Sequence, residues 1–544
     1  MEKIALHKMT RNRQKTDVII IGAGPTGLLL ANLLGNMNVS VIIVEKNKTT
    51  VNEPRAVSID DESMRALQAA NLSKEIEGIL VRGYGSIYKG PRGDVFASVK
   101  PFDKEYGFDK RNAFQQPELE DILNKSLANY KNVNALFGFQ MYEFTQRNEL
   151  VFTTLKNTDG LEISIESQFM IGCDGAHSSV RKLLDINLKG GSFVEPWLII
   201  DLCSTKNRCS HTEVFCNPKR SCITLPGPNG VRRYEFKLNS GEDPKKVIEE
   251  QFVRDLLQSV GPDRDEKIRR VKVYTFHARV AEKWRDKSVF LAGDAAHLTP
   301  PFAGQGMNSG LRDAHNLAWK LDEVLKNRSK LGILDSYESE RTPHAWSMID
   351  LAIKMGRIMM PKSRIQGFII RNGFKLLGLY GPARDYFSQM KYKPKPRFLT
   401  GLIWPDNRSG KNTLIGRMIF QNLLEDFEGK LNLLDDILPD KPALIIFSRK
   451  PERAVCEKLL FDIGNEGASI IGITPEDTKA IKTMLPIFRD KSRHFSRKPY
   501  PYYLDYVLLL RRDRYIAASC KIENIDDMRP KIKTLTSAIE NQIF

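Results

Sequence analysis

The pattern of apolar and polar positions predicts a strand, a helix and a second strand near the start of the chain. Residues 18–21 are a continuous β-branched apolar run, which is typical of a strand buried on both faces of a parallel sheet. From about residue 25, leucines recur at the spacing of a helix with a broad apolar face, and residues 40–44 form the next apolar run. This order predicts an α/β fold built on a parallel sheet.

Three glycines join the first predicted strand to the helix, at the spacing of a dinucleotide-binding fingerprint. Gly22 permits a tight turn, Gly24 lets the backbone approach a pyrophosphate, and Gly27 lets helix and strand pack closely. The helix N-terminus at Pro25 then offers free N–H groups to phosphate oxygens. Glu45 ends the second strand, where its carboxylate can accept hydrogen bonds from a ribose hydroxyl. The segment therefore predicts a dinucleotide site rather than an ordinary glycine-rich turn.

A second segment repeats the order of strand, turn and helix. The apolar run 288–292 ends at Gly293 and Asp294, and Asp294 can accept hydrogen bonds from a sugar or ribityl chain. After a proline-rich loop a helix is predicted from about residue 309 to 325, and the N–H groups at its start suit the electron-rich edge of a flavin. We interpret His297 as structural rather than catalytic, because a lone histidine does not establish a mechanism. A nicotinamide-only enzyme needs no second clamp, so the two segments together predict FAD.

A third strand, turn and helix is predicted over residues 170–181. Asp174 and Gly175 lie at the end of its strand, and Ser178 or Ser179 can cap the helix that follows. A structural turn alone would explain the glycine. In combination with the other two segments, we favour a role on the cofactor side.

The middle and the end of the chain predict two further units. Alternating runs at 197–203, 213–216, 222–225 and 232–238 predict an antiparallel sheet. After a linker rich in Pro and Gly at 394–405, we expect buried strands at 443–447 and 506–510 and a helix near 528–541. The predicted boundaries are a discontinuous FAD-binding domain over 1–80, 105–190 and 275–390, a substrate-binding sheet domain over 81–104 and 191–274, and a C-terminal domain over 400–544.

Composition narrows the class of protein. The 544 residues suffice for two or three domains, and the apolar and charged fractions are ordinary for a soluble protein. The first 16 residues lack the apolar core of a secretory signal, and no apolar run reaches transmembrane length, so we expect a cytoplasmic protein without an integral membrane segment. The seven cysteines form no C-x-x-C pair and no zinc spacing, so we expect neither a metal site nor a disulfide framework.

The net charge of +17 does not by itself predict nucleic-acid binding, because Lys and Arg are dispersed among acids. The densest basic stretch, 489–497, precedes aromatic residues at 500–503, and we interpret it as a solvated loop rather than a nucleic-acid site. Residues 366–381 combine many apolar side chains with Arg371 and Lys375. For this segment we favour a core helix between domains over an interfacial helix lying on a membrane.

Several longer motifs point to one family. They are Gly22–Gly27, Pro54-Arg55-Ala56, 59–63, 111–117, Cys173-Asp174-Gly175, Gly293-Asp294, 304–310 and 316–320. The chain resembles the single-component, group A flavoprotein aromatic hydroxylases, and it is most similar to the 3-(3-hydroxyphenyl)propionate hydroxylase branch. The resemblance covers most of residues 16–390.

The resemblance implies both an architecture and a reaction. The architecture is a Rossmann-like FAD-binding domain of the glutathione-reductase-like, p-hydroxybenzoate hydroxylase type, an antiparallel sheet below the substrate pocket, and a thioredoxin-like C-terminal domain. The reaction is hydroxylation of a small phenolic substrate with FAD, NADH or NADPH, and O₂, through a flavin C4a-hydroperoxide. Because the C-terminal domain has no C-x-x-C, we expect it to serve structure or dimerisation rather than redox chemistry.

The resemblance also assigns residues to the cofactor. Arg55 and Gln116 are expected near the pyrophosphate and ribityl chain of FAD, Asp294 at the ribityl chain, and Asp174 on the flavin side. The full set of predicted cofactor-binding residues is Gly22, Gly24, Pro25, Thr26, Gly27, Glu45, Lys46, Arg55, Arg111, Gln116, Asp174, Gly293, Asp294, Pro301, Gly304, Gln305, Gly306, Met307 and Asn308.

Two alternatives remain open at this point. The same flavin chemistry could act on a larger polyketide, quinone or antibiotic, or the protein could be an FAD-binding protein that mainly associates with a partner or a membrane. No catalytic residue is assigned. His211, Tyr234 and His277 are candidates for the base that activates the phenol, and for each we favour a structural role. Homodimerisation is also left open.

Overall fold

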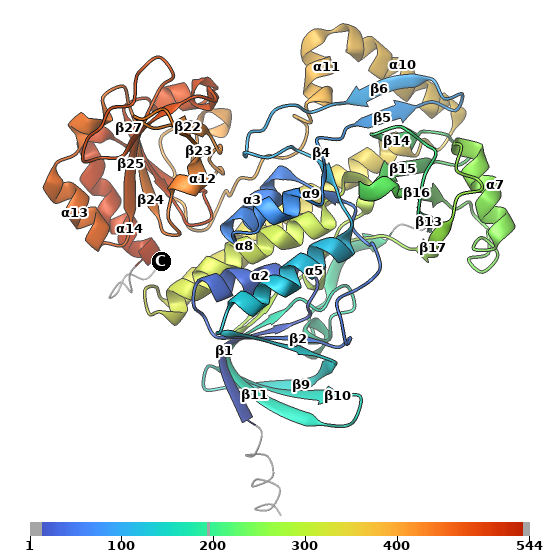
Figure 1. Ribbon diagram of the computed structural model, residues 1–544, viewed down its shortest axis with the longest axis horizontal. Coiled ribbons are helices and arrows are strands. Elements are labelled where there is room, and N and C mark those ends of the chain that lie inside the picture. Colours follow the sequence, from blue (N-terminus) through green and yellow to red (C-terminus); the bar gives the residue numbers. More distant parts are fainter. Residues whose placement is uncertain (1–12, 193–195, 537–544) are drawn as a thin grey trace, which may run out of the picture.

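The computed structural model describes residues 13–192 and 196–536, and its central sheet is mostly parallel (Figure 1). The strand order is β19–β20–β11–β1–β2–β8, in which only β19 runs antiparallel to its neighbour, and the hairpin β9–β10 extends from β11. The strands of this sheet are β1 Arg13–Ile21, β2 Val41–Glu45, β8 Val133–Phe137, β9 Phe139–Arg147, β10 Leu150–Asn157, β11 Glu162–Gly172, β19 Arg285–Asp286 and β20 Val289–Leu291.

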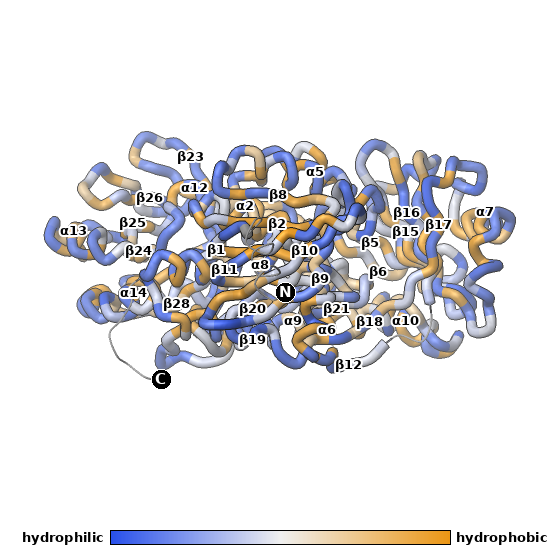
Figure 2. The backbone as a smooth tube through the Cα atoms, turned by 90° about the horizontal axis from the view of Figure 1, so that it is seen from below, coloured by the Kyte–Doolittle hydropathy of each residue, from blue (hydrophilic) through white to orange (hydrophobic). Residues whose placement is uncertain are grey.

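The first strand is buried on both faces, as its apolar run predicts. Val18, Ile19 and Ile20 have no exposed surface, and the hydrophobic colour in Figure 2 is concentrated along β1, β2 and the adjoining helices. Helix α2 Pro25–Asn36 packs on β1 and β2, and α5 Gln116–Ser126 and α8 Gly306–Leu325 pack on α2. Helix α8 begins three residues before its predicted start, so the glycine-rich motif at 306–308 is its first turn.

The second sheet is seven-stranded, in the order β17–β13–β16–β15–β14–β5–β6. All its neighbours are antiparallel except the β5–β14 pair, and it contains the four strands predicted between 197 and 238. Two strands from an earlier part of the chain, β5 and β6, complete it. The bounds are β5 Ser86–Lys89, β6 Val95–Val99, β13 Trp197–Leu202, β14 Thr212–Phe215, β15 Cys222–Pro226, β16 Arg232–Lys237 and β17 Ile268–Tyr274.

Two three-stranded sheets and several helices connect these units. The sheets are β3 Ser58–Ile59, β7 Asn112–Ala113 and β4 Val81–Arg82, and β12 Leu188–Ser192, β18 His277–Ala281 and β21 His297–Leu298. The helices are α3 Asp61–Ala69, α4 Ser73–Glu77, α6 Ser179–Leu183, α7 Glu250–Val260, α9 Asp335–Met359, α10 Arg364–Leu379 and α11 Gly381–Ser388. Within the described ranges, no helix is both long and apolar enough to cross a membrane.

The interpretation of residues 366–381 as a core helix is wrong. Helix α10 packs on β6 at one end of the molecule (Figure 1), and Gly367 is its only buried residue. Large apolar side chains cover its outer face, including Phe368, Ile369 and Leu376, each at least 60% exposed. Helical periodicity locates an apolar stripe but does not reveal what covers it.

The C-terminal part is a separate seven-stranded sheet, ordered β23–β22–β26–β25–β24–β27–β28. The predicted strands at 443–447 and 506–510 are β24 and β27 with the same bounds, and they pair antiparallel. The remaining elements are β22 Leu423–Glu425, β23 Leu431–Leu433, β25 Ser469–Thr474, β26 Ile487–Asp490, β28 Ile516–Lys521, α12 Leu434–Ile437, α13 Glu457–Asn465 and α14 Arg529–Thr536. The predicted helix near 528–541 is α14 up to residue 536, and its remainder lies outside the described residues.

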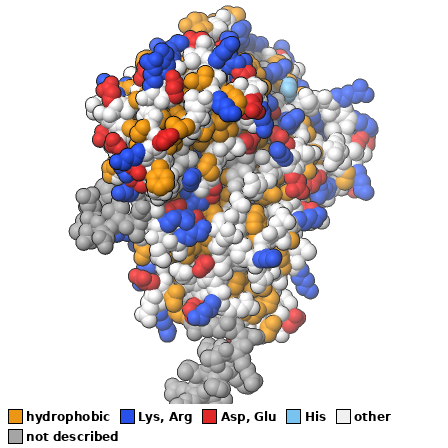
Figure 3. All heavy atoms as spheres, turned by 60° about the vertical axis from the view of Figure 1, so that its left-hand side comes forward, with side chains coloured by type: hydrophobic (Ala, Val, Ile, Leu, Met, Phe, Trp, Pro, Cys, Tyr) orange, Lys and Arg blue, Asp and Glu red, His pale blue; other side chains and the backbone are white. Residues whose placement is uncertain are grey.

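Charges are interspersed over the face shown in Figure 3, where Lys and Arg lie beside Asp and Glu. The densest basic stretch also has acidic partners. Arg489 pairs with Glu425, and Arg497 pairs with Asp103. The prediction of a solvated loop is confirmed only in part, because residues 489–490 belong to β26 and Asp490, His494 and Phe495 are buried.

Candidate cofactor and substrate site

The turn after β1 has the geometry that its three glycines predict. Gly22 has a φ of +106°, and a Cβ there would overlap the carbonyl oxygen of Cys173. A Cβ on Gly27 would overlap the carbonyl oxygen of Gly22. At Gly24, by contrast, an added Cβ would have no atom within 4 Å. The first and third glycines therefore allow close packing, whereas the second faces open space that a pyrophosphate can approach.

The Glu45 carboxylate lies against this turn. One oxygen accepts a hydrogen bond from the backbone N–H of Ala23 at 3.1 Å, and the other accepts from the backbone and side chain of Asn47 at 3.0 and 2.6 Å. The acid is thus held at the carboxyl end of β2, beside the glycine turn, where a ribose hydroxyl can reach it. The neighbouring Lys46 is exposed.

The two main segments of the predicted site are in direct contact. Gly293 has a φ of +60°, and a Cβ there would lie 2.7 Å from the hydroxyl oxygen of Thr26. A Cβ on Gly310 would overlap the same hydroxyl. Only residues without a side chain allow this approach, which brings the start of α2 against the start of α8.

Asp294 and Arg55 face the same space. Solvent reaches the Asp294 side chain, yet protein surrounds it on most sides, and this burial raises the pKa of its carboxyl group while the charges of His297 and Arg55 partly oppose the rise. Arg55 is exposed, and its side chain makes no hydrogen bond or ion pair with any residue that the structure describes. An exposed carboxylate and an uncommitted guanidinium close enough for their charges to interact are suited to a ligand that carries both hydroxyl and phosphate groups.

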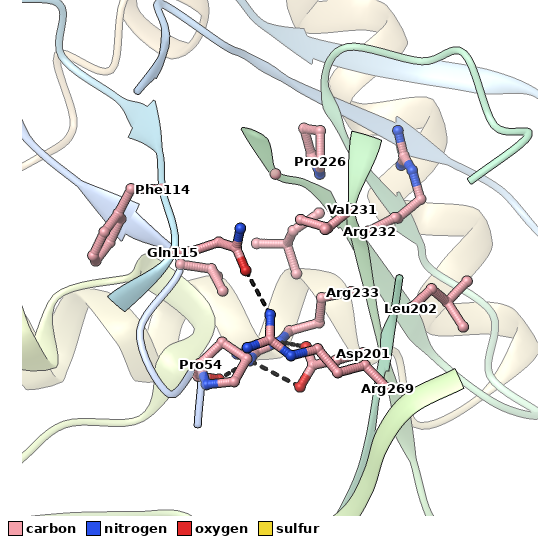
Figure 4. Close-up of a pocket in the computed structure, with 13 residues that line it drawn as sticks. Pro54, Phe114, Gln115, Asp201, Leu202, Pro226, Val231, Arg232, Arg233 and Arg269 are labelled. Atoms are coloured by element: carbon pink, nitrogen blue, oxygen red, sulfur yellow. Dashed lines mark hydrogen bonds and ion pairs between the residues drawn. The ribbon is translucent and has the colours of Figure 1, made fainter. Parts of the chain in front are cut away.

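Side chains of the second sheet, from β16 and β17, hold the loop that carries Arg55 (Figure 4). Arg233 donates to the carbonyl oxygens of Pro54 and Arg55, the latter at 2.7 Å, and its Nε donates to Asp201 at 2.7 Å. Arg270 donates to the other Asp201 oxygen at 2.8 Å and to the Pro54 carbonyl at 3.0 Å. One buried aspartate thus orients two arginines that fix the backbone of this loop.

Gln116 holds the same loop from the opposite side. Its side-chain oxygen accepts the backbone N–H of Ala56 at 2.7 Å, and its amide nitrogen donates to Glu120 at 2.7 Å. Burial raises the pKa of Glu120 to about 7, although Gln116 and the N–H of Val51 oppose the rise. Both ends of the Gln116 amide are therefore engaged within the protein.

The loop that leads into α8 is also fixed by its own polar side chains. The Asn308 amide donates to the carbonyls of Gly304 at 2.6 Å and Ser58 at 3.0 Å, and Gln305 accepts from Arg312 at 2.9 Å. Helix α8 has no side-chain cap. Its first turn follows Pro301 and contains Gly306 and Met307. The backbone N–H groups of this turn have no acceptor within the helix and are available to a ligand.

The third segment joins the second. Ser178 caps α6 by accepting the N–H of Arg181, and Arg181 donates to the carbonyl of Ala295 at 2.9 Å. Asp174 accepts the N–H of Ser179 at 2.6 Å, and its other oxygen is buried without a hydrogen-bond partner among the described residues. Burial raises the pKa of Asp174. This acid caps a helix with one oxygen and keeps the other free of hydrogen bonds to the described residues.

Comparison with known proteins identifies the family to which a chain with this site belongs. A family described as an FAD binding domain matches residues 15–352. A 3-(3-hydroxy-phenyl)propionate/3-hydroxycinnamic acid hydroxylase of Klebsiella pneumoniae is 38% identical over 438 residues, 80% of this chain and 79% of that protein. A hydroxylase of the same name from Escherichia coli is 34% identical over 462 residues, covering 85% and 83%.

The chain belongs to this family of FAD-dependent monooxygenases. Solved structures agree on the fold. The flavin-dependent monooxygenase PieE, in complex with FAD and substrate, aligns with a TM-score of 0.78 at 17% identity over 96% of this chain and 99% of that one. Aklavinone-11 hydroxylase with FAD and aklavinone aligns at 0.76 and 21% identity over 95% and 98%. The fold is thus the mixed α/β fold of these flavoenzymes, and the cradle described above fits FAD, which supplies the redox chemistry when bound.

In this monooxygenase Arg111 precedes β7 and lies against β5 of the seven-stranded sheet β17–β6. Its guanidinium donates to the hydroxyl groups of Ser86 and of Tyr84, the latter at 3.0 Å, and stacks 4.5 Å from the Tyr84 ring centre. Its charge also acts on Tyr88 and Tyr392. Burial raises the pKa values of both tyrosines, that of Tyr392 to about 12, and the positive charge of Arg111 partly opposes the rise. No carboxylate of the described residues lies within ion-pair distance of Arg111.

Arg111 is connected to the α8 loop through two short strands. The residue after it, Asn112, pairs with Ile59, and the carbonyl of Ser58 accepts the Asn308 amide. An aromatic cluster spans the same region. Phe302, beside Pro301, packs against Trp197 and Phe276 at 5.4 and 6.0 Å between ring centres and shares one hydrophobic cluster with Tyr88 and Tyr392.

The histidines and the tyrosine considered as bases all have hydrogen-bond partners within the protein, although His211 lies near Arg111. His297 is buried and pairs with Asp313 at 2.7 Å, which supports its structural interpretation. Tyr234 donates to Asp263 at 2.8 Å within the cluster under α7, and His277 bonds Ser192 in a separate small sheet. His211 accepts the N–H of Gly85, and burial and nearby cations lower its pKa.

No group of His, Cys, Asp and Glu side chains in the described part of the chain is arranged to hold a metal ion. The sequence motifs identified the cofactor segments but missed Asp201, Arg233 and Arg270. These residues have no motif of their own, because their role depends on contact with a loop that is remote in sequence.

Proposed function

We propose that this monooxygenase hydroxylates the ring of a small phenol that carries a carboxylate, of the 3-(3-hydroxyphenyl)propionate type. NADH or NADPH is the electron donor and O₂ the oxidant. The names of relatives that are 34–38% identical support this substrate class. The single structural observation that carries it is Arg111, a guanidinium without a carboxylate partner among the described residues, at the edge of an aromatic cluster.

We further propose which residues hold FAD. The backbone at Gly24 and the start of α2 receive the pyrophosphate together with Arg55, Glu45 receives the adenosine ribose, and Asp294 receives the ribityl chain. The N-terminus of α8 faces the pyrimidine edge of the flavin, where its dipole favours negative charge. Gln116, Gln305 and Asn308 act by positioning these loops, since their amides bond to protein.

Arg111 is assigned to the substrate instead of FAD. Ser86 and Tyr84 use two of the five N–H donors of its guanidinium, and the other three are available to a carboxylate. A charge-assisted, bidentate contact there would orient the acid while the phenol ring lies among Trp197, Phe302 and their neighbours. These apolar side chains exclude water from the reacting ring.

The remaining parts of the proposal concern the whole protein. The C-terminal sheet is proposed to be thioredoxin-like, because β24 and β25 are parallel strands joined through α13 and are followed by the antiparallel pair β27–β28 and then α14. We also propose the predicted domain boundaries, a cytoplasmic location and homodimeric assembly. Sedimentation of the purified enzyme tests the assembly.

The function is tested by substrate-stimulated oxidation of NADH and NADPH under air, with analysis of the product. Hydroxylated product from 3-(3-hydroxyphenyl)propionate or 3-hydroxycinnamate would support the proposal. A flavin spectrum without stimulation by any simple phenol, but with turnover of a polycyclic quinone or polyketide, would replace the substrate class.

The role of Arg111 is tested by comparing two substrates, the acid 3-(3-hydroxyphenyl)propionate and the neutral 3-propylphenol. In Arg111→Gln the KM for the acid is expected to rise about ten- to a hundred-fold, the loss of a charged hydrogen-bond pair, while the KM for the neutral phenol changes little. FAD content should match that of wild type and of the exposed control Arg92→Gln. Loss of FAD in Arg111→Gln alone would return this residue to the cofactor site.

A further inference from the structure

The segment 364–388, which forms helices α10 and α11, carries the largest group of exposed apolar side chains in the described chain. Eight of them are 53–83% exposed: Ile365, Phe368, Ile369, Leu376, Leu377, Leu379, Tyr380 and Tyr386. Contiguous apolar surface of this kind on a protein marks a binding surface. We call these eight residues the α10 face.

The α10 face is not needed to hold the helix on the protein. The inner side of α10 does that, because Phe374 packs against Phe96 at 6.0 Å and Phe387 at 4.7 Å, and Ile370 joins the same cluster. Helix α10 is therefore apolar on two opposite sides, one packed and one exposed. An apolar stripe on a helix is normally covered by protein or by lipid.

The segment that carries the α10 face is strongly basic, and Asp94, which precedes β6, pairs with two of its cations, Arg371 and Lys375. Residues 357–395 contain nine Lys or Arg and a single acid, Asp385. Some of these cations are used inside the protein, as when Lys393 pairs with Asp60 and Glu62. Four others are exposed and have no carboxylate of the described residues within ion-pair distance: Arg357, Lys362, Arg364 and Lys391. The net charge of +17 for the whole chain has the same sign.

We infer that the α10 face binds the surface of an anionic lipid bilayer. An amphipathic helix lies in the plane of a membrane by burying its apolar face at the headgroup boundary, while flanking Lys and Arg attract anionic lipids. The apolar side chains of α10 and α11 and the free cations Arg357, Lys362, Arg364 and Lys391 lie on one stretch of chain, 357–391. The binding is peripheral and uses a surface separate from the proposed cofactor site.

A second copy of the chain is a poorer occupant. In a two-fold contact the same patch meets itself, so the cations that border the α10 face would be brought toward one another. An anionic bilayer instead offers apolar depth and negative charge together. Because α10 packs on β6, docking would turn the substrate sheet toward the bilayer and leave the C-terminal sheet away from it (Figure 1).

The test is flotation of the FAD-loaded enzyme with two kinds of vesicle, pure phosphatidylcholine and phosphatidylcholine mixed with phosphatidylglycerol. The enzyme is expected to float with the mixed vesicles, and high salt should weaken this binding because exposed charges are screened. The double variant Phe368→Ser, Leu376→Ser should lower the partition coefficient by about ten-fold or more, since each buried apolar side chain contributes to the binding. The charge variant Lys362→Glu, Arg364→Glu should act in the same direction.

The matched control is Phe461→Ser, which removes an equally exposed aromatic side chain from α13 in the C-terminal sheet. It should bind vesicles as the wild type does. All variants should keep wild-type NAD(P)H oxidation without vesicles, which shows that they are folded. Absence of wild-type flotation, or equal flotation of the Phe368/Leu376 variant, would overturn the inference. A concentration-dependent dimer broken by that variant, without flotation, would assign the α10 face to a second copy.

Discussion

Single residues in the glycine turn separate folding from cofactor binding. Gly22→Ala is expected to lower the free energy of unfolding of the apoprotein by about 1–3 kcal/mol, because its positive φ and its contact with Cys173 both oppose a side chain. Gly24→Ala should leave apoprotein stability unchanged, since its backbone is extended and its added methyl meets no atom within 4 Å. The Gly24→Ala substitution should nevertheless lower the affinity for FAD by about ten-fold or more, because the added methyl group occupies the space through which the pyrophosphate approaches the backbone.

Thermal unfolding of both apoproteins and fluorescence titration with FAD distinguish the two effects. Wild-type FAD affinity in Gly24→Ala would mean that the pyrophosphate binds elsewhere. An apoprotein of Gly22→Ala as stable as wild type would mean that the turn relaxes around a side chain.

Motifs predict which residues bind the cofactor but not which partners their side chains have. Gln116 and Asn308 were predicted as FAD contacts, yet their amides bond to Ala56, Glu120, Ser58 and Gly304. Those partners come from remote parts of the chain. A single sequence does not contain that information, because a hydrogen bond between distant segments depends on the completed fold.

At the scale of elements, hydrophobic periodicity predicts well whether a segment is a helix or a strand, but it predicts poorly what that element packs against. The runs at 443–447 and 506–510 became strands with the expected bounds, because continuous apolar segments of that length are buried strands in most sheets. The segment 366–381 is helical as expected, but its partner was misjudged. The joining of β5 and β6 to β14 is likewise a long-range pairing, which local pattern does not encode.

The loop 53–56 provides a prediction at this scale. Arg270→Gln is expected to weaken FAD binding by about three- to ten-fold without touching the cofactor, because the loop that carries Arg55 loses its bond to the Pro54 carbonyl. Equilibrium titration with FAD measures this. The control Arg264→Gln removes an exposed arginine that has only a weak partner in Asp265. FAD affinity equal in the two variants would show that the loop keeps its place without Arg270.

At the scale of the whole molecule, buried charges join the C-terminal sheet to the cofactor-binding part. Glu340 on α9 accepts from Lys320 on α8 at 2.7 Å and from Arg511, after β27, at 2.6 and 2.8 Å. The N–H of Leu402 in the linker donates to the same carboxylate at 2.9 Å. All three charged side chains have no exposed surface. One carboxylate therefore connects two helices, the linker and the C-terminal sheet.

Glu340→Gln is expected to destabilise the protein by about 3–5 kcal/mol, because it leaves Lys320 and Arg511 buried with reduced compensation. Burial alone would raise the pKa of Glu340, but Arg511 and Lys320 lower it to about 2, below its ordinary value of 4.5. A lowered pKa in the folded state contributes stability above pH 4.5 that is lost as the pH falls toward 2. The difference in unfolding free energy between wild type and variant should therefore shrink as the pH falls through that acid range.

Chemical denaturation at several pH values, followed by fluorescence, measures this difference. Asp335→Asn is the matched control on the same helix, since its ion pair with Arg285 is largely exposed on the carboxylate side and exposed pairs contribute about 0–1 kcal/mol. A Glu340→Gln protein as stable as this control would mean that the C-terminal sheet is held by apolar packing alone. If the variant is destabilised but the difference does not change with pH, the loss comes from packing around residue 340 instead of from its charge. The expected result would make the junction electrostatic, and the C-terminal sheet should then separate from the flavin-binding part before the latter unfolds.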